Sequence, residues 1–103
     1  MKKEYIQVLT TVNTKELAHK IANLLIDKKV AGCVQIIPIE SFYRWKDNIK
    51  NSNEFLCIAK GKNFELIKDA ILEVHPYVLP EIIEVPISNG YEKYLTWLDS
   101  ETK

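Results

Sequence analysis

The amino-acid sequence predicts a single α+β domain that contains an unusually long β-hairpin. Three observations support this prediction. Runs of strand-forming residues alternate with two amphipathic helical segments, two long apolar arms flank a short polar break, and each helical segment follows a residue suited to capping it. The chain has 103 residues, the length of one domain, so residues 1–103 are assigned to one unit.

The first strand and the first helix follow from local patterns. Residues 4–11 favour strand formers and alternate loosely in polarity, which predicts a strand. Asn13, with Glu16 three residues later, is typical of a helix N-terminus, and the helix is expected to run to about Lys29. Its predicted apolar face consists of Leu17, Ala18, Ile21, Ala22 and Leu25.

Residues 34–45 and 49–60 form the arms of the predicted hairpin, because both are rich in β-branched and aromatic residues. Between them lie Asp47 and Asn48, which tolerate turn geometry. An arm of this length reaches roughly 40 Å at about 3.3 Å per residue, whereas a domain of this size measures on the order of 33 Å across. The hairpin is therefore expected to overhang its own domain. Pro38 indicates an edge strand or a bulge.

The second half of the chain adds a helix, a strand and a further helix. Asn63 is suited to capping a second helix, which Pro76 ends. Residues 81–87 are predicted to form the last strand, with Pro86 near a sheet edge, and Asn89-Gly90 predicts a turn. The complete order is a split βαβ arrangement. The predicted fold class is therefore α+β: a ferredoxin-like βαββαβ sandwich with a long hairpin between its second and third strands and an extra C-terminal helix.

The hairpin tip predicts self-association. It contains Phe42, Tyr43 and Trp45, which together form more apolar and aromatic surface than a soluble monomer leaves in water. Pairing with other copies of the chain would cover this surface. The overhang thus predicts an oligomer without fixing the number of subunits.

Composition argues against several classes of partner. Fourteen basic and fourteen acidic residues cancel, and Arg44 is the one arginine, so nucleic-acid binding is not expected. No segment approaches the ~20 apolar residues of a membrane span, and no signal-peptide core follows Lys2 and Lys3. We therefore expect a cytoplasmic protein with neither a membrane nor a nucleic-acid partner.

Cys33 and Cys57 are the two cysteines of the chain. Both lie in apolar, strand-like runs, where a free cysteine acts as a small buried hydrophobe. Two cysteines do not make a disulfide framework. Reduced thiols are expected.

Six short motifs, spread over nearly the whole chain, indicate a family. They are Val-Ala-Gly-Cys-Val-Gln at 30–35, Ser-Phe-Tyr-Arg-Trp at 41–45, Glu54 with Lys60, His-Pro-Tyr at 75–77, Pro-Glu-Ile-Ile at 80–83, and Tyr-Leu-Thr-Trp at 94–97. In this order and spacing they resemble the CutA family of divalent-cation tolerance proteins. Departures are small and remove no candidate ligand: Gly32, Gln35 and Gly61 stand where alanine, asparagine and threonine are common.

The resemblance implies both an assembly and a role. It implies ferredoxin-like subunits in a tight homotrimer that exchange long strands, and a function in tolerance to copper and other divalent metals. Copper binding is attributed to some members of the family, and catalysis is not well established. The expected cofactor is therefore copper or another divalent metal ion, no enzyme activity is expected, and a protein partner is left unidentified.

Cys33, His75 and Glu81 are the candidate metal ligands. A thiolate, an imidazole and a carboxylate together suit copper or zinc, but no two of these residues have a metal-binding spacing, so the fold must bring them together. Each residue also has a structural interpretation. Cys33 packs as a small apolar residue, His75 caps the C-terminal carbonyls of a helix, and Glu81 is solvated or pairs with a cation.

A second group of candidates forms a pocket or an interface between subunits. Arg44 and Lys60 either hold an anionic ligand or pair with Glu40 or Glu54 across the hairpin. No catalytic constellation or glycine-rich phosphate loop stands out. The aromatic members of the group either line a ligand pocket or form an oligomer interface; they are Tyr43, Trp45, Tyr77, Tyr94 and Trp97.

Three functional hypotheses follow. The first is a metal-binding homotrimer with a site built from Cys33, His75 and Glu81. The second is a trimeric signalling or adaptor module, resembling PII proteins, that binds a small anionic effector or a partner protein and depends more on Lys60, Arg44 and Glu54. The third is a scaffold whose hairpin serves only assembly. We favour the first hypothesis.

Overall fold

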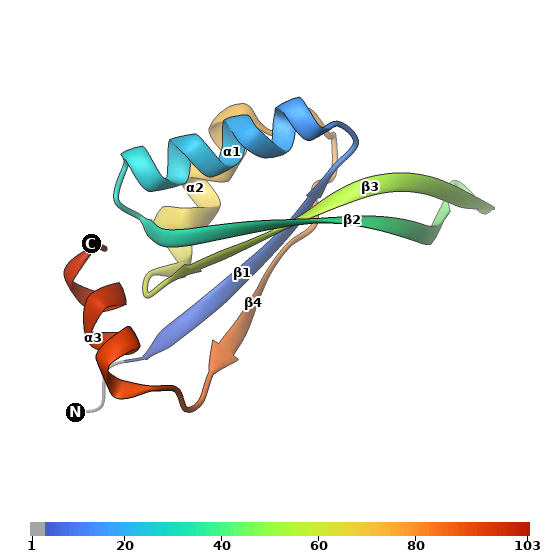
Figure 1. Ribbon diagram of the computed structural model, residues 1–103. Helices are drawn as coiled ribbons and strands as arrows, with labels where there is room; N and C mark the ends of the chain where they lie inside the picture. The colour runs from blue at the N-terminus through green and yellow to red at the C-terminus, as the bar shows by residue number, and fades with distance from the viewer. Residues whose placement is uncertain (1–3) are drawn as a thin grey trace.

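The structure, a computed structural model, describes residues 4–103 as one antiparallel sheet with three helices. Its elements follow the order β1 (Tyr5–Val12), α1 (Lys15–Asp27), β2 (Ala31–Trp45), β3 (Asn48–Gly61), α2 (Phe64–Val74), β4 (Ile82–Ile87) and α3 (Glu92–Ser100). The strand order in the sheet is β2-β3-β1-β4, and α1 and α2 lie on one face (Figure 1). The ferredoxin-like α+β prediction is confirmed. Within residues 4–103, no helix is long and apolar enough to cross a membrane.

The hydrophobic core lies between the sheet and the two helices α1 and α2. Alternate residues of a strand share one face, and every third or fourth residue of a helix shares one stripe, so each element contributes a single apolar side. From β1 this side includes Val8 and Val12, which are fully buried. The helices and β3 complete the core with Ala18, Ile21, Leu25, Ile67, Ala70, Ile71, Cys57 and Ala59.

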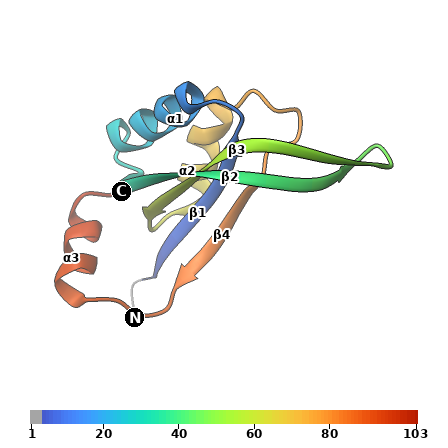
Figure 2. The ribbon, with the colours of Figure 1, turned by 45° about the vertical axis from the view of Figure 1, so that its right-hand side comes forward.

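The long hairpin is present as predicted. Its ladder runs from Ala31 opposite Gly61 to Trp45 opposite Asn48. Lys46 and Asp47 form the turn with φ angles of 50° and 65°, the left-handed geometry that matches the twist of a two-residue hairpin loop. The turn lies within the predicted break at 46–48, and β3 begins at Asn48, one residue before the predicted return arm. The molecule measures 45 × 25 × 22 Å, and Figure 2 shows the hairpin projecting beyond the helices.

Two prolines lie on the edges of the sheet. Pro38 is in β2 opposite Phe55, and Pro86 is in β4 opposite Ile6. Each of these strands has a neighbour on one side only, and such edge strands are where a residue without an N–H is tolerated. The edge predictions are confirmed. The bulge of β2 lies at Gly32 rather than at Pro38.

The N-cap predicted for α1 is wrong by one residue. Thr14, not Asn13, has the extended backbone of a cap, and its side chain accepts a hydrogen bond from the Leu17 N–H at 3.1 Å. A capping oxygen must lie directly before the first helical residue to reach the first-turn N–H groups. Asn13 lies one residue too early. In α2 the predicted cap is confirmed, because Asn63 Oδ1 accepts from the Leu66 N–H.

Helix α1 also ends at Asp27, two residues before the predicted end. Lys29 adopts a φ of 59°, which reverses the chain. The Lys29 N–H then donates to the Ile26 carbonyl and the Val30 N–H donates to the Leu25 carbonyl. These two bonds form a Schellman motif and satisfy carbonyls that the helix end leaves unpaired.

Helix α3 is fixed against the end of the sheet where β2 begins. Leu98 is fully buried, and an ion pair of 2.8 Å joins Lys62 to Asp99. A Cβ atom on Gly32 would lie 2.8 Å from the Leu98 Cδ1 atom. The glycine at position 32, where the family resemblance favours alanine, thus lets Leu98 approach the strand closely.

We expect Thr10→Val to stabilise the fold. Thr10 is 1% exposed on the helix-facing side of β1, and its hydroxyl has no hydrogen-bond partner among the described residues. Replacing a buried, unpaired hydroxyl by a methyl group should raise the free energy of unfolding by ~1 kcal/mol. Urea denaturation checks this. Thr10→Ser, which keeps the hydroxyl and removes the methyl group, should lower the free energy of unfolding, and a gain in stability there would contradict the explanation.

Candidate functional site

The candidate site residues lie around the face of the sheet that α1 and α2 leave uncovered. Residues that pair directly across antiparallel strands share a face, so this face runs through Leu9, Ile58 and their neighbours. Its apolar side chains are partly or largely exposed; they include Ile37, Leu56, Ile83 and Val85. An apolar surface of this kind is typical of an interaction site.

One group of side chains, which we call the thiol cluster, lies at the α3 end of this face. Cys33 is opposite Lys60 in the ladder, and Lys60 Nζ donates to Gln35 Oε1 at 2.9 Å. The same ammonium lies 5.9 Å from the centre of the Tyr94 ring. Burial raises the pKa of Tyr94, and the neighbouring, hydrogen-bonded Cys33 raises it further. Trp97 packs on Tyr94 with ring centres 5.5 Å apart.

Lys60 is thus not paired with Glu40 or Glu54, as one interpretation of the sequence expected. Glu40 instead accepts from the Asn51 side chain, and Glu54 accepts from Tyr77. The pairing fails because Glu54 lies six residues from Lys60 along β3, roughly 20 Å away, whereas Gln35 lies two residues from Cys33 on the same face of β2, within reach of Lys60. Arg44 forms no ion pair in the described part of the chain.

A second group, the histidine cluster, lies where β1 ends. His75 Nε2 donates to the Thr11 carbonyl at 2.9 Å, and the Tyr77 N–H donates to His75 Nδ1 at 3.2 Å. Because a carbonyl can only accept, this arrangement requires the neutral Nε2–H tautomer. The Tyr77 hydroxyl donates to Glu54 Oε2 at 2.7 Å, and the His75 and Tyr77 rings meet edge to face at 4.8 Å.

Burial controls the titration of the histidine cluster. It lowers the pKa of His75, and the Thr11 carbonyl and the Glu54 charge oppose this only in part. It also raises the pKa of Tyr77, as do the hydrogen bond and charge of Glu54. Glu54 itself is only 8% exposed, so the Tyr77 hydroxyl supplies a hydrogen bond that water cannot easily replace.

Pro76 explains why His75 sits here. A residue before proline avoids the helical region, and His75 has φ −73° and ψ 126°. The helix therefore ends at Val74, and the imidazole turns toward β1 instead of capping the carbonyls of α2. Sequence patterns did not identify Thr11 as its partner, because Thr11 contributes a backbone carbonyl that any residue would supply.

One chain does not bring the three predicted metal ligands together. Positions along β3 show their separation. Cys33 pairs with Lys60 of β3, whereas Thr11, whose carbonyl accepts from His75, pairs with Leu56 of β3. Four residues of strand separate these levels by roughly 13 Å.

Glu81 is exposed and directly precedes β4, near the level of the histidine cluster. Within residues 4–103, no three His, Cys, Asp or Glu side chains converge to hold a metal. The ligand set therefore stays a prediction that a single chain does not complete.

The two thiols differ in environment. Cys57 is fully buried on the helix-facing side, where burial raises its pKa to about 11. Cys33 is half-buried on the other face, and neither forms a disulfide. Cys33 is thus the thiol that a metal ion can reach.

The remaining aromatic candidates lie on the hairpin, where Tyr43 is still near enough to the histidine cluster to contribute to the raised pKa of Tyr77. The Tyr43 hydroxyl lies 3.4 Å from Ser52 Oγ, and Trp45 closes the ladder beside the turn. Their neighbours Phe42 and Ile49 are 69% and 73% exposed. This projecting surface has no cover in the described chain.

The fold and the two clusters define a class: a small ferredoxin-like protein with polar clusters around an uncovered apolar sheet. The family model described as "CutA1 divalent ion tolerance protein" matches residues 6–101. This chain belongs to the CutA1 family of divalent-cation tolerance proteins.

Individual relatives resemble the chain over nearly its full length. The divalent-cation tolerance protein CutA of Thermus thermophilus is 38% identical over 98 residues, which cover 92% of this chain and 95% of that protein. The solved CutA1 of Oryza sativa has a TM-score of 0.94 at 36% identity and covers 98% of this chain and 95% of its own. The solved periplasmic divalent cation tolerance protein CutA of Archaeoglobus fulgidus has a TM-score of 0.93 at 34% identity, covering 96% and 99%.

We expect the free energy of unfolding to decrease as the pH falls, because His75 titrates differently in the folded and unfolded chain. Because burial lowers the pKa of folded His75 below its ordinary 6.5, the unfolded chain takes up a proton first as the pH falls. The contribution of His75 should be complete above pH 6.5 and be lost as the pH drops below that value. Denaturation at a series of pH values checks this.

Two variants separate His75 from other titrating groups. His75→Gln should reduce the slope of stability against pH in this window, whatever its effect on absolute stability. His19→Gln, on the exposed side of α1, controls for replacing an imidazole. An unchanged slope in His75→Gln would contradict the assignment.

Proposed function

We propose that this chain is a non-enzymatic, metal-binding component of divalent-cation tolerance that works as a homotrimer and binds copper or a similar divalent ion. Membership of the CutA1 family supports the tolerance role. The observation that carries the metal-binding part is Cys33: an accessible thiol among polar neighbours at the border of an uncovered apolar face. A soft thiolate favours copper and zinc.

The hairpin and the uncovered sheet face support self-assembly. The hairpin lengthens the molecule, which measures 45 Å along its longest axis, and exposes Phe42 and Ile49, while the sheet exposes Ile37 and Ile83. A second and third copy would remove these surfaces from water, which favours association by roughly 25 cal/mol per Å² before its entropic cost. The number three comes from the resemblance.

The donor chemistry fits a site shared between copies better than a site within one chain. Cys33 and the pair His75–Glu81 lie at different levels of the sheet, so the three meet only if different subunits contribute them. Both ring nitrogens of His75 are already bonded to backbone groups. A metal at Nδ1 would replace the Tyr77 N–H, so binding should rearrange the loop after α2.

The absence of catalysis is also part of the proposal. A nucleophilic cysteine needs a base within hydrogen-bond reach. Within one chain, Cys33 has Lys60 and Tyr94 as neighbours, while His75 bonds to the far end of β1. A Cys–His pair is thus not formed in the subunit.

We place the protein in the cytoplasm. Its unpaired cysteines support a reducing compartment, in which Cys33 stays available as a ligand.

Assembly through the hairpin predicts that Trp45→Glu lowers the native mass. A charge on the projecting apolar surface cannot be buried without a large desolvation penalty, so the assembly should dissociate. Native mass spectrometry measures this. Ile26→Glu is a matched control, because Ile26 is similarly exposed on α1, on the outer side of the helices. The hairpin does not mediate assembly if Trp45→Glu keeps the wild-type mass.

Metal binding is tested by equilibrium titration of the reduced protein without air. Cu(II) and Zn(II) are titrated in parallel, because zinc has no redox chemistry with which to oxidise the thiol. We expect saturation near one ion per chain and a loss of at least about tenfold in affinity, ~1.4 kcal/mol, for both Cys33→Ala and His75→Ala. Cys57→Ala is the matched control, since that thiol is buried on the other face. Affinity indifferent to Cys33→Ala would contradict the proposal.

Mixing the two variants tests whether the site is shared. Cys33→Ala and His75→Ala proteins are unfolded together and refolded, so that mixed oligomers form. If different subunits contribute the two ligands, some interfaces in the mixture regain both, and part of the high-affinity binding returns. A mixture that binds no better than its two components places both ligands in one subunit.

A further inference from the structure

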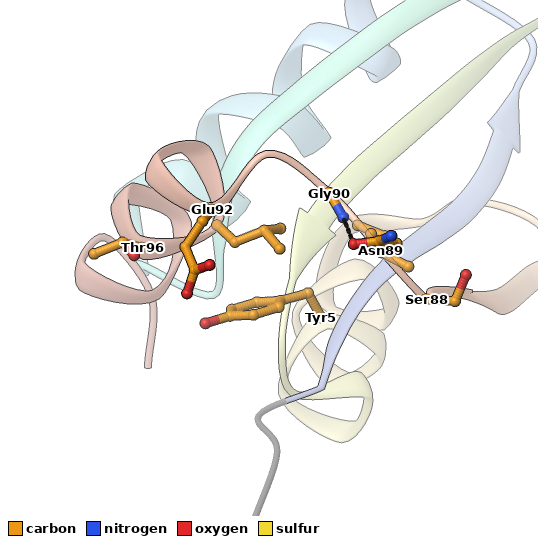
Figure 3. A pocket seen from close by; sticks show the side chains of 8 residues that line it. Tyr5, Ser88, Asn89, Gly90, Glu92 and Thr96 are labelled. Atoms are coloured by element: carbon orange, nitrogen blue, oxygen red, sulfur yellow. Dashed lines mark hydrogen bonds between the residues drawn. The ribbon is translucent and has the colours of Figure 1, made fainter.

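The connection between β4 and α3 contains an asparagine–glycine pair that the proposed function does not use. Asn89 and Gly90 are exposed and lie outside the strands and helices. The Gly90 N–H donates to the Asn89 Oδ1 atom at 3.0 Å, so the side chain folds onto the next peptide (Figure 3). Both residues line a hollow of about 300 Å³ together with Tyr5 and Leu95.

We propose that Asn89 is a site of spontaneous covalent modification, in which the chain reacts with itself and then with water. A base removes the Gly90 amide proton, and the nitrogen attacks the Asn89 Cγ atom. The new N–C bond closes a five-membered succinimide as the C–N bond of the side-chain amide breaks and ammonia leaves. Water then adds to either carbonyl of the ring. The products are aspartate and isoaspartate, with no change in oxidation state.

The geometry at Asn89 favours this reaction. The hydrogen bond holds the Gly90 nitrogen 3.0 Å from the Asn89 Oδ1 atom, so the nucleophile already lies beside the side-chain amide whose Cγ atom it attacks. Glycine has no Cβ to hinder closure of the ring. Exposure admits base and water, and the adjoining hollow leaves room for the backbone to move.

Other asparagines lack this combination. Asn51 lies in the β3 ladder, and its side chain donates to Glu40 and to the Ser41 carbonyl. Asn63 precedes a phenylalanine, and its Oδ1 is held by the Leu66 N–H as a helix cap. In both cases the residue after the asparagine carries a side chain. The asparagine side chain is hydrogen-bonded to a group other than the N–H of that next residue.

The modification would act on α3. Isoaspartate adds a methylene group to the main chain and a negative charge, both within three residues of Glu92 at the first turn of α3. Helix α3 carries Tyr94 and Trp97 of the thiol cluster. The chemical class of partner for the product is a methyltransferase that esterifies isoaspartyl carboxylates with S-adenosylmethionine.

Ageing the folded protein in mildly alkaline buffer tests the proposal. We expect the peptide containing Asn89 to gain the mass difference between –NH₂ and –OH, with methyl acceptance from an isoaspartyl methyltransferase rising in parallel. Gly90→Ala should slow both by at least about tenfold, ~1.4 kcal/mol in the barrier. A Cβ at position 90 lies 3.3 Å from Leu95 side-chain atoms, so this variant needs only a small shift to fold.

The controls decide the result. Asn89→Gln should abolish the mass gain at this peptide, because the longer side chain closes a larger ring. Equal rates in wild type and Gly90→Ala overturn the proposal, as does a gain that appears first at Asn51. No gain in the folded protein, under conditions in which the urea-unfolded chain converts, overturns it as well. None of these readouts involves metal binding, so the outcome is independent of the proposed function.

Discussion

The rest of the structure depends on the continuous ladder between β2 and β3. Fourteen partner pairs hold Ala31–Trp45 against Asn48–Gly61, while β1 reaches only as far as Phe55 on the same strand. The part of the hairpin beyond Glu54 therefore has no third strand and no helix to cover it. The ladder satisfies its backbone, yet its side chains need a surface that this chain does not provide. This uncovered surface is the one that the proposed assembly would bury.

Patterns that repeat along the chain predicted the fold well. Period-two and helical apolar patterns located the elements, and prolines located the edges, because each reflects which face of an element is buried. The misplaced cap at Asn13 shows the limit of this approach. Asn13 and Thr14 are both suitable caps, and where β1 ends decides between them. That end is set by pairing with β3, which local sequence does not show.

For the candidate site, the sequence offered individual residues but not their arrangement. The family motifs pointed to Cys33, Lys60, His75 and Tyr94, whereas the partners that fix their geometry are Gln35 and the Thr11 carbonyl. A backbone carbonyl cannot be recognised as a partner from the sequence, because every residue has one. His75 is the C-cap of α2 through its backbone N–H, which donates to the Ile71 carbonyl, but its imidazole does not cap the helix. Pro76 fixes the direction of the chain, and the fold alone determines what the imidazole then meets.

In the proposed function, the separation of the two clusters would connect assembly with metal binding. If Cys33 and His75 were neighbours in one subunit, a metal site would exist without an oligomer, and the exposed hairpin would need another explanation. They lie instead at different levels of one sheet, the thiol among Lys60 and Tyr94 and the imidazole held by two backbone bonds. A metal ion that uses both must bridge subunits, so its binding would stabilise the assembly by mass action. Metal binding would then stabilise the oligomer, and oligomer formation would raise the affinity for the metal by the same factor.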